Sequence, residues 1–105
     1  MAGADADRGD ALIEVERTST VPDGWAFTVR VIEANGQTEH RVTVARADYE
    51  RLTGLAVHPE VLVEKTFEFL LAREAKYAIL RQFDLAVVAH YFPEYETELK
   101  RALSV

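Results

Sequence analysis

The chain has 105 residues, the size of one domain, and 49% of them are hydrophobic, which is enough for a packed core. It contains no cysteine, so disulfides and thiolate metal sites are excluded, and we expect a cytoplasmic protein. The net charge of −6 argues against nucleic acid as a partner, because phosphates repel an acidic chain. No apolar run approaches the roughly 20 residues that cross a bilayer, so no membrane contact is expected.

The first ten residues, MAGADADRGD, are rich in aspartate and have no apolar run, so they do not resemble a signal peptide. We expect residues 1–10 to be a disordered lead-in and residues 11–105 to form a single domain.

Three strands are predicted next in the chain. Residues 12–19 and 25–33 alternate apolar and polar side chains, which is the period of a half-buried strand, and residues 37–44 return after the hairpin signal Asn35-Gly36. A two-residue turn at that signal predicts a register that keeps the apolar side chains of both strands on one buried face. These side chains are Phe27, Val29, Val42 and Val44.

Helices are predicted in the second half of the chain. Asp48 and Asp84 are expected N-caps, Gly54 and Pro93 are expected stops, and Pro59 is expected at a first helical position. The predicted ranges are 48–53, 59 to about 76, 84–92 and 94–103. The order indicates an α+β fold, in which a small antiparallel sheet of three N-terminal strands has one face covered by three to four C-terminal helices.

An arginine pair is the first candidate site. The predicted register places Arg30 opposite Arg41 on the outer face of the sheet, where facing like charges destabilise pairing. One interpretation is a groove that binds anions or nucleic acid. The other is a solvated surface on which Glu14, Glu16 and Glu39 neutralise the two arginines.

An acidic column is the second candidate. Glu60, Glu64 and Glu68 recur every four residues, so they stack on one face of the predicted helix. The column is either complementary to a basic partner or an ordinary solvated face that Lys65 partly neutralises.

Aromatic side chains are concentrated in residues 83–95. Tyr91, Phe92 and Tyr95, together with Trp25, are residue types found in cores and also at protein interfaces. The side chains of Tyr91 and Phe92 point about 100° apart on a helix, so we do not expect one domain to bury both of them fully. The sequence leaves open whether this set is core or interface.

Reaction chemistry is not evident in the sequence. His40, His58 and His90 are far apart and have no metal-ligand spacing, and the five glycines are scattered singly at turns. No pairing of nucleophile and base is apparent, so we expect neither a cofactor nor a metal nor enzymatic activity.

Three segments, FEFLLARE (67–74), AILRQFDL (78–85) and YFPEY (91–95), resemble a group of small uncharacterised bacterial proteins. The resemblance covers roughly the last 45 residues. It implies family membership but no activity and no site residues.

Two functions are therefore expected from the sequence. The first is a small interaction or regulatory domain that acts through a homodimer or through partner contacts, with Tyr91, Phe92, Tyr95 and the acidic column as its surface. The second is binding of anions or nucleic acid through Arg30 and Arg41.

Overall fold

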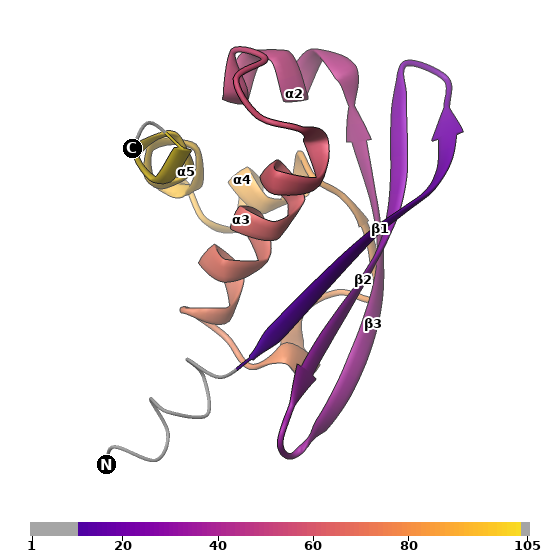
Figure 1. The fold of residues 1–105 in the computed structure, drawn as a ribbon. Helices are drawn as coiled ribbons and strands as arrows, with labels where there is room; N and C mark the ends of the chain where they lie inside the picture. The colour runs from indigo at the N-terminus through magenta and orange to yellow at the C-terminus, as the bar shows by residue number, and fades with distance from the viewer. Residues whose placement is uncertain (1–10, 104–105) are drawn as a thin grey trace.

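A four-stranded sheet with helices on one face forms the protein (Figure 1). The computed structural model describes residues 11–103, and the predicted lead-in over residues 1–10 lies outside this range. The strands lie in the order β1-β2-β3-β4. They are β1 (Leu12–Val21), β2 (Gly24–Glu33), β3 (Gly36–Ala45) and β4 (Gln82–Asp84). The α+β class and the three N-terminal antiparallel strands are confirmed.

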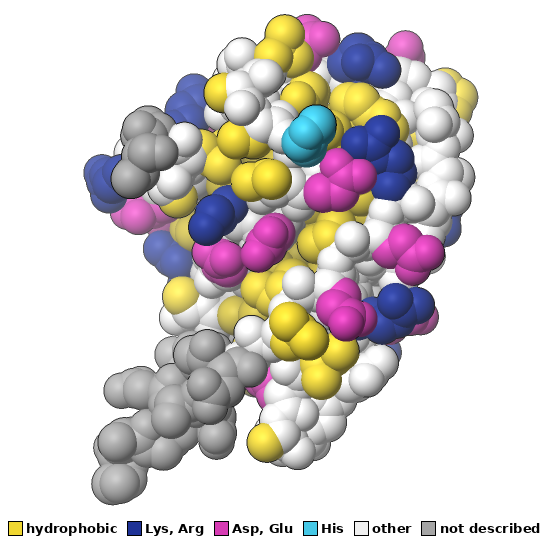
Figure 2. Space-filling model, in the orientation of Figure 1, with side chains coloured by type: hydrophobic (Ala, Val, Ile, Leu, Met, Phe, Trp, Pro, Cys, Tyr) yellow, Lys and Arg dark blue, Asp and Glu magenta, His cyan; other side chains and the backbone are white. Residues whose placement is uncertain are grey.

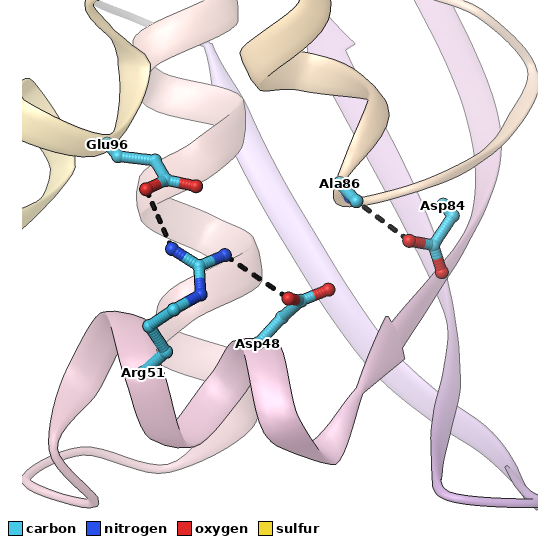
Figure 3. Close-up of polar contacts among 5 residues, drawn as sticks. All are labelled: Asp48, Arg51, Asp84, Ala86 and Glu96. Carbon is cyan, nitrogen blue, oxygen red and sulfur yellow. Dashed lines mark hydrogen bonds and ion pairs between the residues drawn. The ribbon is translucent and has the colours of Figure 1, made fainter.

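The fourth strand corrects the predicted strand count. Gln82–Asp84 pairs parallel with Arg41–Thr43, so the sheet is mixed and not wholly antiparallel. Three residues are too few to show a strand period, and the predicted cap at Asp84 is also wrong. Its carboxylate lies at the end of β4, where it accepts hydrogen bonds from Thr43 Oγ1 (2.6 Å) and from the backbone N–H of Ala86 (3.1 Å; Figure 3).

The turn of the β2–β3 hairpin also differs from the prediction. It is centred on Ala34-Asn35, and Gly36 pairs with Glu33 as the first residue of β3. Gly36 has a φ of 136°, a conformation that glycine tolerates best. The glycine therefore follows the turn and is not its second central residue.

This turn moves the pairing by two residues. Phe27 lies opposite Val42, whereas the predicted register pairs it with Val44. A shift of two residues keeps every side chain on its own face of the sheet, because side chains alternate with a period of two. The predicted buried face is confirmed, since Phe27, Val29, Val42 and Val44 are all buried.

Four helices and one 3-10 turn complete the fold within the described part of the chain. They are α2 (Arg46–Thr53), α3 (Pro59–Leu71), η1 (Lys76–Ala78), α4 (Val87–Tyr91) and α5 (Tyr95–Leu103). The helices lie on one side of the sheet (Figure 1), where α3 contacts β1 and α2 contacts β2 and β3. The core fills the space between this face and the helices.

Some predicted helix boundaries are confirmed and others are wrong. Pro59 begins α3, and Gly54 ends α2 in the left-handed conformation with a φ of 62°. The N-cap of α2 is Ala45, so Asp48 lies in the first turn instead of capping the helix. α3 stops at Leu71, about one turn before the predicted end, and α4 is shorter than predicted because β4 uses the residues before it.

An arginine joins two of these helices. Arg51 on α2 donates to Asp48 (3.2 Å) on its own helix and to Glu96 (2.7 Å) on α5 (Figure 3). The contact ties the C-terminal helix to the start of the helical layer.

Candidate functional site

The aromatic segment divides into a buried part and an exposed part. Tyr95 is 1% exposed, and its hydroxyl lies 2.7 Å from Thr66 Oγ1. Burial raises the pKa of the Tyr95 hydroxyl well above its ordinary value. Phe92 is half-buried and packs edge-on against Phe69, at 5.7 Å between ring centroids. Tyr91, by contrast, is 68% exposed. Tyr95 therefore belongs to the core, whereas Tyr91 lies on the surface.

An apolar pocket lies beside the exposed part. Its volume is about 220 Å³, and its walls come from the end of α3, η1, β4 and α4. Leu70, Ile79, Phe83, Val88 and Phe92 are among its lining residues.

The two large side chains that line this pocket and are themselves exposed form its rim. They are Leu80, at 49% exposed, and Tyr91. Among the described residues that line the pocket, Glu74 is the only charged one. The pocket is thus an apolar recess with one carboxylate.

His40 holds one wall of the pocket in place. It is buried in β3, and its Nδ1 lies 2.8 Å from the backbone oxygen of Leu80, while its Nε2 lies 2.8 Å from Thr38 Oγ1. A carbonyl only accepts hydrogen bonds, so Nδ1 carries the proton and Nε2 accepts from the threonine. Burial lowers the pKa of His40, which favours this neutral form. The histidine is therefore a structural link between the sheet and the rim.

Lys76 holds a second wall and is a residue that the sequence analysis missed. Its side chain is buried, and its Nζ donates to Glu33 and to Asn35 Oδ1, both at 2.6 Å. The hydrogen bond with Glu33 raises the pKa of Lys76. The ammonium also lies 4.4 Å from the ring centre of Tyr77. A lysine in an apolar stretch is the one sequence signal for this link between η1 and the β2–β3 hairpin.

The acidic column is partly neutralised. Glu60 accepts two hydrogen bonds of 2.9 Å from Arg17 on β1, which lower the pKa of its carboxyl. Glu68 pairs with Lys65 at 3.3 Å, as the sequence predicts. Glu64 makes no ion pair with any residue in the described range. The column therefore keeps a net negative charge along α3.

The predicted arginine pair does not form. Arg30 lies opposite Glu39 and pairs with it at 3.0 Å, and it also contacts Glu16 at 3.6 Å. Arg41 lies opposite Thr28. The shifted register separates the two arginines, and the predicted neutralisation by Glu16 and Glu39 is confirmed for Arg30.

The three histidines lie in different surroundings. His58 and His90 are exposed and far apart in sequence from the buried His40. Within residues 11–103, no group of three or more histidine, aspartate or glutamate side chains is placed to hold a metal ion. None of the helices in the same range combines the length and apolar character needed to cross a membrane.

Comparison of the chain with protein-family models, curated proteins and solved structures gave no match. The candidate site therefore depends on the geometry of this molecule alone.

Proposed function

We propose that the protein is a small interaction domain whose pocket beside α4 binds apolar side chains of a partner protein. The observation that carries the proposal is the recess of about 220 Å³ with the exposed Leu80 and Tyr91 at its rim. An apolar cavity of about 150 Å³ holds a benzene ring, so this pocket has room for one aromatic or branched aliphatic anchor. Exposed apolar side chains around a recess are typical of an interaction site.

The pocket favours a helical partner over an added strand. β4, the strand beside it, is only three residues long, so it offers little backbone for pairing. An amphipathic helix would instead place anchors from successive turns in the recess and against the rim.

Charge favours a basic partner over a second copy of this chain. The one carboxylate in the lining, Glu74, suits a lysine or arginine beside the anchor, and Tyr91 offers a ring to the same cation. Two copies would each bring a net charge of −6, which opposes association at low salt. We also propose a cytoplasmic location, because the chain has no cysteine.

Titration with a synthetic amphipathic helix tests this function. The probe is a 16-residue peptide with leucine and phenylalanine on one face and lysine on the other, followed by backbone NMR. We expect shifts that centre on Leu80, Val87 and Tyr91. A peptide with glutamate in place of lysine should bind at least several-fold more weakly.

Two variants of the protein make the test specific. Ala78→Phe should fill the pocket, since Ala78 lines it and is exposed, and should weaken peptide binding roughly tenfold or more. Ala102→Phe on the exposed side of α5 is the matched control and should bind normally. Equal peptide binding by both variants would contradict the proposal. A dimer of the protein that Tyr91→Ala dissociates would also contradict it, because a second copy of the chain would then occupy the pocket.

Binding of anions or nucleic acid through Arg30 and Arg41 is less well supported as an alternative. It requires a concentrated positive charge, whereas Arg30 is already paired with two glutamates.

A further inference from the structure

The outer edge of β1 is a second surface with features of a binding site. β1 is the first strand of the sheet, and among the described residues it pairs with β2 alone. An edge strand of ten residues presents unpaired backbone N–H and C=O groups along its outer side. Its pairing with β2 is interrupted between Arg17 and Ser19, so Leu12–Arg17 is the regular part.

Apolar side chains accompany this regular part. Ile13 and Val15 lie opposite the buried Val31 and Val29, which places them on the helix-covered face, yet both are only partly buried. Leu12 is 53% exposed. A further strand beside β1 would therefore bury apolar surface as well as pair its backbone.

Carboxylates lie on both sides of the same edge. Glu14 and Glu16 lie on the outer face of β1 and are exposed. On the inner side, the acidic column of α3 begins beside β1, because Glu60, its first member, pairs with Arg17 of that strand. Figure 2 shows acidic side chains around the hydrophobic surface between α3 and β1.

The nearby cations are already engaged. Arg30 on β2 pairs with Glu39 and, at 3.6 Å, with Glu16, so Glu16 is partly neutralised, whereas Glu14 makes no ion pair with any described residue. Arg17 binds Glu60, and its guanidinium lies 5.5 Å from the ring centre of Trp25. Lys65 pairs with Glu68. The edge therefore keeps a negative character that a cationic segment would complement.

Pairing with a second copy of β1 is disfavoured in the registers centred on its carboxylates. In antiparallel pairing, the apolar faces of two copies stay together when the pairing is centred on a residue. If that residue is Glu14, Val15 or Glu16, a glutamate of one copy lies opposite a glutamate of the other. Like charges directly opposite each other destabilise a sheet.

We propose that the edge of β1 accepts an extended segment of another protein as a fifth strand, in which apolar side chains alternate with lysine or arginine. The apolar side chains pack beside Ile13 and Val15, and the basic ones lie beside Glu14 and Glu16. This surface is at the opposite end of the strand order from β4 and the pocket, so the inference does not depend on the proposed function.

Hydrogen exchange with a strand-forming probe tests the inference. The probe is a seven-residue peptide of alternating lysine and valine with blocked ends. It should slow amide exchange at alternate residues of Leu12–Arg17, and binding should weaken as salt is raised. The same peptide with an N-methyl group on every backbone amide should not protect β1, because it has no backbone N–H left to donate to the carbonyl groups of the edge.

A matched pair of variants separates charge complementarity from general electrostatics. Glu14→Gln should weaken binding of the lysine–valine peptide roughly twofold to fivefold. Glu50→Gln makes the same charge change at an exposed position on α2 and should leave the affinity unchanged. Three results would each overturn the inference. They are equal protection of β1 by the N-methylated peptide, protection centred on Leu80 and Val87, and no binding at millimolar peptide.

Discussion

The two helices that follow β4 use their tyrosines in opposite ways. Tyr95, at the start of α5, is almost fully buried, with its hydroxyl bonded to Thr66 and its ring 5.2 Å from that of Phe69. Tyr91, at the end of α4 and four residues earlier, is two-thirds exposed at the rim of the pocket. Residues of the same type, one helical turn apart in sequence, thus belong to the core and to the surface.

The difference comes from the chain between them. α4 is five residues long and ends before Pro93, and Tyr95 begins a new helix that packs across α3. The α5 side of α3 is therefore closed by buried rings, whereas the α4 side keeps an open recess. Packing around α5 contributes to stability, and the α4 side is the candidate for binding.

The largest expected effect is on stability at the α5 side. Tyr95→Ala removes a buried aromatic ring and should lower the free energy of unfolding by about 3–5 kcal/mol. Tyr91→Ala changes an exposed position and should lower it by less than about 0.5 kcal/mol. Urea denaturation of both variants measures the contrast, and similar losses would mean that the two helices do not differ in burial.

A smaller loss of stability is expected from a substitution in the β2–β3 hairpin, which contacts η1 beside the pocket. Gly36→Ala would place a Cβ 2.7 Å from the Tyr77 hydroxyl at a φ of 136°, so we expect a loss of more than about 1 kcal/mol. Ala34→Gly, in the same turn, is the control for flexibility and should cost less. The chemical denaturation midpoints of the two variants give the comparison. A neutral Gly36→Ala would mean that residue 36 does not hold a positive φ in the folded protein.

The effect of pH on the link through His40 is expected to be graded. The pKa of His40 is lowered in the folded protein, so the unfolded chain takes up a proton more readily. Stability from the neutral histidine should be complete above about pH 6.5 and should fall as the pH drops below it toward the folded pKa. Denaturation midpoints at several pH values would show this slope, and His40→Gln should remove it. The contribution of Glu60, whose pKa is lowered from 4.5, is complete above about pH 4.5 and is lost only at more acidic pH.

The faces of the sheet were predictable from sequence, whereas the contacts around the pocket were not. The alternation of Phe27 and Val29 fixes a face whatever the turn, because a shift of two residues does not change it. The opposition of Arg30 and Arg41 depends on the register itself, and it failed when the turn moved by one position.

The pocket has a different difficulty. Its lining residues all lie between Leu70 and Phe92, but β4, which forms part of the wall, pairs in parallel with a strand some 40 residues earlier. Lys76 and His40 are held by partners 40 or more residues away. Contacts between residues so far apart leave no local period or spacing in the sequence. Only the folded structure therefore shows which exposed side chains surround the pocket.

Fluorine NMR of the tyrosines tests the central claim most directly. The chain has four tyrosines, so a 3-fluorotyrosine-labelled protein should give four signals, with Tyr91 assigned through Tyr91→Phe. Titration with the basic amphipathic peptide should shift the Tyr91 signal in a saturable way and leave the Tyr95 signal unchanged. A Tyr91 signal that does not respond, or a response centred on Tyr95, would contradict binding at the open side of α3.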